Sequence, residues 1–585
     1  MITLGISCSH DGTLSIVRDG IHEYSIAEER INRIKSYIGF PFKSLRHAID
    51  SGKIDPTDVH SVAVPLASYP ARSAWMYAFI TTEDKLYYDI QNESPPNGFS
   101  LPDDGWSHVR TDDQCEKYVR NKIQKLLSEV GINAPIEFYD HHLCHASSAY
   151  FSSGLSEALA ITLDGEGDGL SASVSICRGN QIQRISSTSR DFSAGYLYSE
   201  VTKRCGFKVS RHEGKITGLA AYGDPLSCLH VLTQHVKVKD GTIYFKGVRR
   251  NNRLEKVLRK LTTPLGHSRS FGAQQIVEKC SEISDADLAA SMQALLESTI
   301  AEIVNYWVEK TGITNIVLAG GVFANVKFNQ KIGELPSVQS LFVFPDMGDG
   351  GGAYGAAMYS NSLRNDRQSP LAPISNVYLG PSFSDAQILD EIKSFTNIDY
   401  RKSDDIALES AQHIANKKVV GWFQGRMEYG PRALGNRSIL ASPIDPSIND
   451  WLNHRMQRTE FMPFAPSCLY EYADEIFEIP KPSLKRPAEF MTITFGMKEY
   501  WAKKAPAVSH VDQTARPQLV RKDVNPLYHR LLSEHLKITG IPLVINTSFN
   551  VHEEPIVCNP SEALRALESS MIDILAIGNY IVTRK

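Results

Sequence analysis

The stretch Ala158-Leu159-Ala160-Ile161-Thr162-Leu163-Asp164-Gly165-Glu166-Gly167-Asp168-Gly169 carries most of the information about the fold. Its first six residues have no charge, which is typical of a strand buried in a sheet. The Asp168-Gly169 pair then predicts a hairpin turn, and residues 171–178 supply the returning strand. Asp164 therefore stands at the end of a buried strand, where its carboxylate would project into a cleft.

The same pattern occurs at the start of the chain. Residues 2–7 and 13–17 are typical of strands joined through His10-Asp11-Gly12, and a third strand is expected at 21–27. The two copies lie about 155 residues apart, which predicts two related lobes whose hairpin turns face one cleft. Two unrelated hairpins are the alternative, because one Asp-Gly turn is a common local signal. Backbone amides in such turns can hold phosphate, so Gly12 is a candidate binding residue.

The stretch Asp140-His141-His142-Leu143-Cys144-His145 predicts a metal site. In a helix, His141 and His145 would lie on one face, so that both imidazoles could reach one ion. The carboxylate of Asp164 would complete an open site for a divalent metal. For the histidine pair alone, a polar helix face is the alternative.

Two glycine-containing turns predict further ligand contacts. An apolar period of 3.6 over residues 288–308 predicts a core helix, and the strand expected at 315–319 leads into Gly320-Gly321-Val322-Phe323-Ala324-Asn325. A strand, paired glycines and a helix in this order favour an anion such as a nucleotide phosphate, so Gly320, Gly321 and Asn325 are candidates. A second turn contains Asp349, which could bind a metal or a ribose.

Residues 211–219 join a basic side chain, Lys215, to a glycine-containing turn. The run is not a Walker loop, because isoleucine follows the lysine and the upstream glycine is missing. Lys215 is a candidate catalytic residue that contacts a phosphate or a carboxylate. A solvated lysine is the alternative.

The C-terminal part is expected to form a separate domain. A polar, proline-containing stretch predicts a linker at 366–378, which leaves a domain at 379–585. Its polar clusters combine arginine with glycine and proline, a composition that a phosphate pocket explains better than a solvated face does. The candidate binding residues there are Arg426, Arg432, Arg437, Arg455, Arg458, Arg516, Asn546 and Ser548.

The bulk composition excludes several classes of protein. A length of 585 residues exceeds what one hydrophobic core usually serves, so two or three domains are expected. A net charge of −4 and a sequence pI of about 6.5 give no general attraction to nucleic acid or to an anionic membrane. The nine cysteines include no C-x-x-C pair, no apolar run reaches membrane-spanning length, and the N-terminus lacks a basic targeting region. We therefore expect a cytoplasmic protein.

Taken together, these motifs resemble the O-carbamoyltransferase family of the NodU/CmcH type over essentially the full length. The resemblance rests on residues 9–12, 141–146, 163–167, 213–215, 320–325, 430–438 and 546–550. It implies an α/β protein with a duplicated actin-like ATPase (ASKHA) fold at 1–365, followed by a YrdC-like α/β domain at 379–585.

The resemblance also implies an activity. The C-terminal domain would form carbamoyl adenylate from carbamoyl phosphate and ATP with magnesium, and the N-terminal domain would pass the carbamoyl group to a hydroxyl of a small molecule, such as a natural product or a sugar. His141, His145, Asp164 and Asp349 match the family's metal ligands, for which iron(II) is the expected ion and another divalent metal the alternative. His10 matches the residue proposed to act at the acceptor hydroxyl, where a neutral imidazole can take the proton.

One departure from the family pattern affects the donor site. Many members carry Lys and Arg where this chain has Met456 and Met462, so Arg455 or Arg458 would have to supply the missing charge. Two rival functions are threonylcarbamoylation of tRNA and a nucleotide-binding regulator without chemistry. The net negative charge argues against the first rival, and the intact set of metal ligands argues against the second. A homodimer is expected only because dimers are common among soluble proteins.

Overall fold

The computed structural model describes residues 1–8, 10–67, 112–247, 271–364, 373–456, 464–551 and 553–585. The chain divides into two compact units. Unit 1 consists of Met1–Glu23 and Tyr37–Pro373, and unit 2 consists of Tyr24–Ser36 and Ile374–Lys585.

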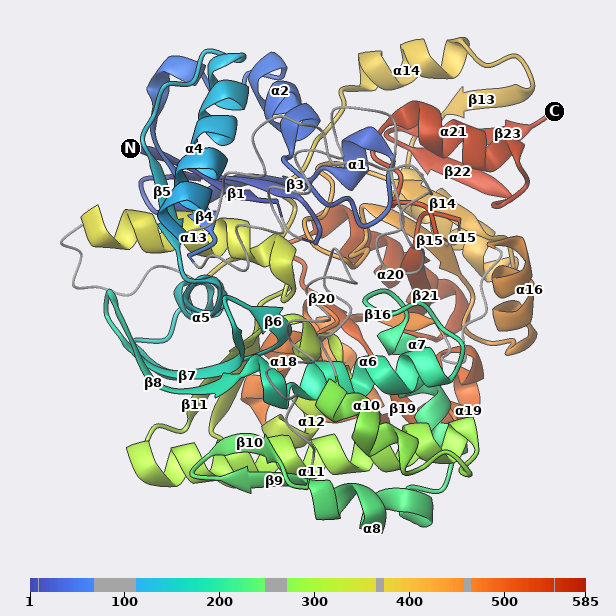
Figure 1. Ribbon diagram of the computed structural model, residues 1–585. Helices are drawn as coiled ribbons and strands as arrows, with labels where there is room; N and C mark the ends of the chain where they lie inside the picture. Colours follow the sequence, from blue (N-terminus) through green and yellow to red (C-terminus); the bar gives the residue numbers. More distant parts are fainter. Residues whose placement is uncertain (9, 68–111, 248–270, 365–372, 457–463, 552) are drawn as a thin grey trace, which may run out of the picture. The chain divides into compact units, whose positions relative to one another are not determined.

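Unit 1 contains two five-stranded sheets of mixed direction. The first has the order β3-β2-β1-β4-β5 and the second the order β12-β11-β6-β7-β8. In each sheet the first strand pairs antiparallel with the next strand in sequence and parallel with a later one, as β1 does with β2 and β4, and β6 with β7 and β11. The two sheets therefore have the same strand order, as expected for two related lobes, and Figure 1 shows β6, β7 and β8 curving together.

The strands of these two sheets have the following bounds. They are β1 (Ile2–Ser7), β2 (Thr13–Arg18), β3 (Ile21–Ala27), β4 (Val59–Pro65), β5 (Ile136–Tyr139), β6 (Glu157–Gly167), β7 (Leu170–Arg178), β8 (Gln181–Ser189), β11 (Asn315–Ala319) and β12 (Ser340–Val343). The strands predicted at 2–7, 21–27 and 315–319 are confirmed to the residue.

Two helices cross between the lobes of unit 1. Helix α5 (His141–Ser153) follows β5 but packs on β6 and β11, whereas α13 (Asp349–Arg364) follows β12 but packs on β1, β2 and β4. The two helices also pack on one another, and the Oγ of Ser147 donates to the carbonyl of Gly355 at 2.7 Å. A Cβ on Gly355 would lie 1.9 Å from the carbonyl oxygen of Cys144, so this crossing requires glycine.

The second lobe carries the long helix α11 (Asp285–Thr311), which confirms the helix predicted from the apolar period. Ser284 caps its first turn, and Gly312 ends it with φ 72°. Other helices of unit 1 are α2 (Phe42–Asp50), α4 (Asp112–Ser128), α6 (Ala194–Arg204), α7 (Glu213–Leu219), α8 (Leu226–His235), α10 (Phe271–Glu278) and α12 (Val326–Glu334). Strands β9 (Val236–Lys239) and β10 (Thr242–Phe245) form an antiparallel pair. Across the described parts of the chain, no helix is both long enough and apolar enough to span a bilayer.

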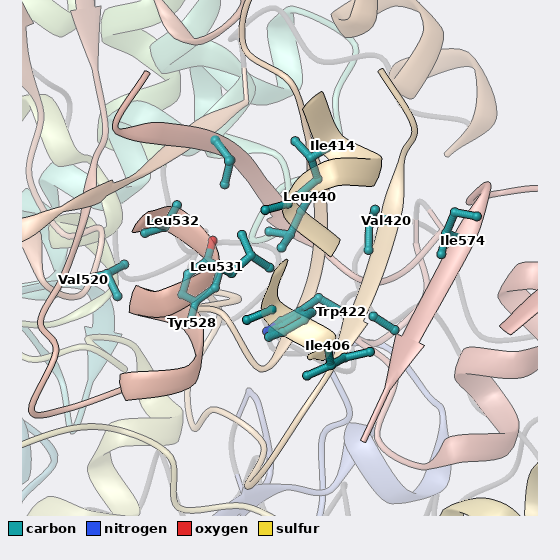
Figure 2. Packing of buried hydrophobic residues seen from close by; sticks show 14 of the residues in the cluster. Ile406, Ile414, Val420, Trp422, Leu440, Val520, Tyr528, Leu531, Leu532 and Ile574 are labelled. Carbon is teal, nitrogen blue, oxygen red and sulfur yellow. The ribbon is translucent and has the colours of Figure 1, made fainter. Parts of the chain in front are cut away.

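Unit 2 is built on an eight-stranded mixed sheet with the order β13-β23-β22-β14-β15-β21-β16-β20. Helices α15 (Ile406–Ala415) and α20 (Pro526–Thr539) pack together, and their apolar side chains meet those of the sheet in one buried cluster. Figure 2 shows Trp422 and Tyr528 in this cluster, with ring centroids 6.4 Å apart. The sheet strands are β13 (Ile398–Lys402), β14 (Val420–Phe423), β15 (Arg437–Ala441), β16 (Ala465–Leu469), β20 (Gln518–Val520), β21 (Leu543–Ser548), β22 (Ile574–Ile577) and β23 (Tyr580–Arg584).

Further helices of unit 2 are α14 (Asp385–Lys393), α16 (Ser447–Arg455), α17 (Ala473–Ile476), α18 (Lys485–Ala488), α19 (Glu499–Lys504) and α21 (Pro560–Glu568). Strands β17 (Phe477–Glu478), β18 (Phe495–Met497) and β19 (Thr514–Ala515) form a small separate sheet.

A short N-terminal segment, residues 24–36, is part of unit 2. It contains the end of β3 and helix α1 (Glu29–Asn32), and it buries three charged side chains, those of Glu28, Glu29 and Arg30. Arg33 donates to the carbonyls of Pro555 and Ile556 at 2.7 and 2.8 Å and pairs with Glu562 at 3.1 Å. Unit 2 is thus assembled from two separate pieces of sequence.

Replacing Arg33 with Met should lower the free energy of unfolding of unit 2 by about 2–3 kcal/mol, because two carbonyls lose their donor and Glu562 loses its counter-charge. Hydrogen exchange of peptides from 420–441 and 543–584 in increasing urea would measure the change. As a control, Lys503→Met removes an exposed pair with Glu499 and should leave the stability unchanged within error. Equal effects of the two substitutions would contradict the role of the segment.

Candidate functional site

Four predicted metal ligands converge in unit 1. His141, His145, Asp164 and Asp349 each offer one ligand atom, and these atoms all lie within 4.8 Å of one another. The Nε2 of His141 is 3.0 Å from Oδ2 of Asp164 and 3.0 Å from Nε2 of His145. The Oδ1 of Asp349 lies 3.6 and 3.7 Å from the two Nε2 atoms.

Three elements deliver these side chains. The two histidines stand one turn apart in α5, Asp164 lies in β6, and Asp349 is the first residue of α13. The carboxylate of Asp140 caps α5 by accepting the N–H of Leu143 at 2.8 Å. The two histidines therefore lie on one face of a helix, as their spacing in the sequence predicts.

The protonation equilibria of the cluster are strongly shifted. Burial disfavours the imidazolium of His141, but the carboxylates of Asp349 and Asp164 outweigh burial and raise its pKa to about 10. Burial alone would raise the pKa of Asp164, yet hydrogen bonds from His141 and His145 hold that pKa well below its usual range. The two carboxylates therefore require positive charge at this place, which a proton on an imidazole or a bound cation can supply.

The donor set fits a divalent transition metal. Two imidazole nitrogens that face each other at 3.0 Å can share one proton or bind one ion. Two carboxylate oxygens lie within 4.8 Å of these nitrogens, close enough to bind the same ion. Mixed nitrogen and oxygen ligands suit iron, manganese, cobalt or zinc, whereas magnesium and calcium prefer oxygen alone.

Glycines allow the ligands to approach so closely. A Cβ on Gly167 would lie 2.0 Å from Cδ2 of His141, and a Cβ on Gly321 would lie 3.0 Å from Oδ1 of Asp164. Gly320 has φ 104° and packs against the carbonyl of Leu163. The paired glycines therefore lie beside the cluster, where they lead into a short 3-10 turn, Gly321–Ala324, before α12.

Replacing Gly167 with Ala should displace the imidazole of His141 and weaken metal binding about 10–100-fold, the range seen when groups that orient ligands are changed. Titration of the metal-free protein with Co(II), followed by visible absorption, would measure the affinity. Gly214→Ala is the control, because its Cβ would meet no atom within 4 Å. An unchanged affinity in the Gly167 variant would contradict this placement of His141.

The third histidine of the motif is a core residue. The Nδ1 of His142 lies 2.7 Å from Oγ1 of Thr162, and the side chain is fully buried. Burial and the neighbouring His141 and His145 lower the pKa of His142 to about 3, so its imidazole is neutral. The Oγ1 of Thr162 continues the network to Ser173 Oγ at 2.8 Å.

The remaining candidates of unit 1 have mixed placements. His10 lies partly buried in the β1–β2 connection, and the N–H of Gly12 donates to the carbonyl of Tyr37 at 2.8 Å, so this amide already has an acceptor. Lys215 is buried in helix α7, with Nζ 5.5 Å from the ring centroid of Phe207, so the turn predicted around it is wrong.

The side chain of Asn325 forms hydrogen bonds within the second lobe. Its Oδ1 caps α12 by accepting the N–H groups of Lys327 and Phe328, and its Nδ2 donates to Oε1 of Gln293 at 2.8 Å. Gln293 also accepts the hydroxyl proton of Tyr198 at 2.8 Å. Asn325 therefore orders the turn after the paired glycines, a role that its position in the motif does not reveal.

Several arginines of unit 2 that were predicted to bind phosphate donate hydrogen bonds to backbone carbonyls. Arg437 is fully buried, donates to the carbonyls of Gln424, Pro381 and others, and lies 3.7 Å from the ring centroid of Phe423. Burial lowers the pKa of Arg437 to about 10. Its charge is part of the interior of unit 2.

Two further arginines also donate to backbone carbonyls of unit 2. Arg426 donates to the carbonyls of Leu379 and Gly380, and Arg455 donates to Ser570 and pairs with Asp573 at 3.2 Å. Arg432, Arg516 and Ser548 are partly exposed, whereas Arg458 and Met462 lie outside the described residues.

Sequence reasoning missed Glu428, which organises residues 430–438, a loop that leads into β15. Its Oε1 accepts the N–H groups of Leu434, Asn436 and Arg437 at 2.8, 2.7 and 3.1 Å. Other side chains bind the loop carbonyls: Asn546 binds that of Ala433, Tyr378 and Gln518 that of Leu434, and Trp422 that of Gly435. The sequence offered one indication of this role: Glu428 is the only acidic residue in the stretch 425–438, which is rich in glycine and arginine.

Replacing Glu428 with Ala should destabilise unit 2 by about 3–5 kcal/mol, because three buried N–H groups lose their acceptor and Arg437 loses a nearby negative charge. Glu428→Gln should cost about 1–2 kcal/mol, since its amide oxygen still accepts. Urea unfolding followed by tryptophan fluorescence would separate the two, with the exposed Glu499→Ala as control. Equal losses in the alanine and glutamine variants would contradict the role of the acceptor oxygen.

Two family models match the chain. The model described as Carbamoyltransferase N-terminus matches residues 2–358, and that described as Carbamoyltransferase C-terminus matches residues 411–584. The chain belongs to the carbamoyltransferase family. It is accordingly a carbamoyltransferase, which confirms the enzyme class expected from the motifs.

Curated relatives of this carbamoyltransferase extend over most of its length. Nodulation protein NolNO of Sinorhizobium fredii is 32% identical over 98% of this chain and 79% of its own length. Uncharacterized protein MJ1058 of Methanocaldococcus jannaschii is 38% identical over 77% of this chain and 74% of its own. Among solved structures, full-length HypF in a phosphate- and nucleotide-bound form gives a TM-score of 0.34 at 12% identity, covering 63% of this chain and 47% of that one, a likeness too weak to establish a shared fold.

Proposed function

We propose that this protein is an ATP-dependent O-carbamoyltransferase that takes its carbamoyl group from carbamoyl phosphate and delivers it to a hydroxyl of a small molecule. The observation that carries the proposal is the convergence of His141, His145, Asp164 and Asp349 in a chain of the carbamoyltransferase family. We assign unit 1 to the actin-like ATPase folds, which the repeated strand order supports, and unit 2 to the YrdC-like folds.

Unit 2 is the proposed site of donor activation. Carbamoyl phosphate, ATP and water would give carbamoyl adenylate, pyrophosphate and phosphate, with ATP bound as its magnesium complex. The ordered loop that leads into β15, residues 430–436, supports this assignment, because Glu428 fixes its backbone while Arg432 is partly exposed. A rigid loop can present a charge to a phosphate without being reordered on binding.

Unit 1 is the proposed site of transfer. The acceptor oxygen would attack the carbamoyl carbon, the C–O bond to AMP would break, and His10 would take the hydroxyl proton. His141, His145, Asp164 and Asp349 would hold a divalent metal, for which we propose iron(II). When bound, such an ion supplies Lewis-acid polarisation of the carbonyl or neutralises charge on the leaving phosphate.

The two half-reactions can be tested separately. Pyrophosphate exchange into ATP should require carbamoyl phosphate and should fall at least about 100-fold in Arg432→Ala, while Arg178→Ala, an exposed arginine, leaves it unchanged. His141→Ala should retain the exchange but lose at least about 100-fold of the carbamoyl transfer. Exchange that does not depend on carbamoyl phosphate, or no exchange with magnesium present, would contradict the donor half of the proposal. Carbamoyl transfer at the wild-type rate by His141→Ala would contradict the transfer half.

A further inference from the structure

A carboxylate beside the metal cluster, that of Asp168, binds two backbone amides from distant parts of unit 1. Its Oδ2 accepts the N–H of His141 at 2.8 Å and the N–H of Ala67 at 3.0 Å. Ala67 follows strand β4 of the first lobe, whereas Asp168 lies in the β6–β7 hairpin of the second. One oxygen atom therefore ties the start of helix α5 to both lobes.

The backbone of Asp168 is held in a costly conformation. Its φ is 51°, in the left-handed region, which is unfavourable for a residue with a Cβ. Aspartate and asparagine tolerate this region best among residues other than glycine. A glycine here would remove the strain, but it would also remove the acceptor.

The amide of His141, which Asp168 binds, lies at the N-terminus of helix α5. His141 is the first residue of α5, and the first N–H groups of a helix have no acceptor within it. Asp140 accepts the N–H of Leu143, so the two aspartates share the first turn between them. His145 lies one turn further in, where the helix itself fixes the backbone, so His141 is the ligand on α5 that needs support from outside.

We propose that Asp168 is a positioning residue of the metal centre: by binding the first amide of α5, it keeps the imidazole of His141 against the other three ligands. The carboxylate acts through the backbone and is not itself one of the four converging groups. This inference rests on the metal site of the proposed function. It adds a residue that no ligand spacing would identify.

The test compares two substitutions in the full-length, metal-free protein. Asp168→Gly keeps the left-handed backbone but loses the acceptor, and should weaken Co(II) binding about 10–100-fold. Asp168→Asn keeps one acceptor oxygen without the charge, and should weaken it about 3–10-fold. The visible spectrum of bound Co(II) should change in the glycine variant as well, because a displaced imidazole alters the ligand field.

The matched control is Asp240→Gly, which makes the same exchange at an exposed aspartate with φ 50° in the β9–β10 hairpin. It should leave both the Co(II) affinity and the spectrum unchanged. A glycine variant at Asp168 that binds Co(II) like the wild type overturns the proposal. If that variant does not fold, as judged by circular dichroism, an unchanged affinity in Asp168→Asn overturns it instead. A wild-type protein that binds no Co(II) or iron(II) overturns the metal site itself, and this inference with it.

Discussion

The close crossing of helices α5 and α13 is the constraint on which the centre of unit 1 depends. Each helix leaves the sheet that precedes it in sequence and packs on the other sheet, so the two must pass one another in the middle. The carbonyl of Cys144 occupies the space that a side chain at Gly355 would need, and Ser147 bonds to the carbonyl of that glycine. Because the crossing is tight, the first residues of both helices reach the C-terminal part of β6, where their side chains meet Asp164; the strand itself continues to Gly167, beyond the end that the sequence predicts.

Unit 2 uses its charged groups differently. A guanidinium is expensive to bury, and Arg437 offsets that cost with carbonyl acceptors, an aromatic ring and the nearby charge of Glu428. In the surrounding loop, three amides bind one carboxylate oxygen of Glu428. The carbonyls of Ala433 and Leu434 accept from the side chains of Asn546 and Gln518, which lie in two different strands. The arginine content of this region therefore reflects the construction of a rigid loop as well as any affinity for phosphate.

Much of unit 1 could be predicted from sequence because its signals are local. Buried strands, Asp-Gly hairpins and the apolar period of α11 each depend on neighbouring residues, and the i, i+4 spacing of His141 and His145 specifies one helix face. The full ligand set, with Asp349 far along the chain, came from the resemblance to a family. Spacing alone could not place it.

The errors and omissions share a physical cause. Whether Arg437 or Asn546 meets a ligand or a carbonyl depends on residues distant in sequence, which a motif does not contain. Lys215 was placed in a turn because glycines surround it, yet packing keeps that segment helical. Residues 24–36 escaped notice for the same reason, since the carbonyls that Arg33 binds belong to Pro555 and Ile556. Glu428 escaped notice although the amides that it binds lie close in sequence, because its motif does not show how the loop folds back onto the carboxylate.

The divided sequence of unit 2 has a consequence for how the chain folds during synthesis. Its first piece, residues 24–36, is synthesised before all of residues 37–373, and the rest of unit 2 is synthesised after them. The ion pair of Glu29 with Arg30 and the donors of Arg33 must therefore wait, exposed to water, while more than 300 intervening residues are made. Charged side chains suit a segment with this history, because they keep it soluble until the surface that buries it exists.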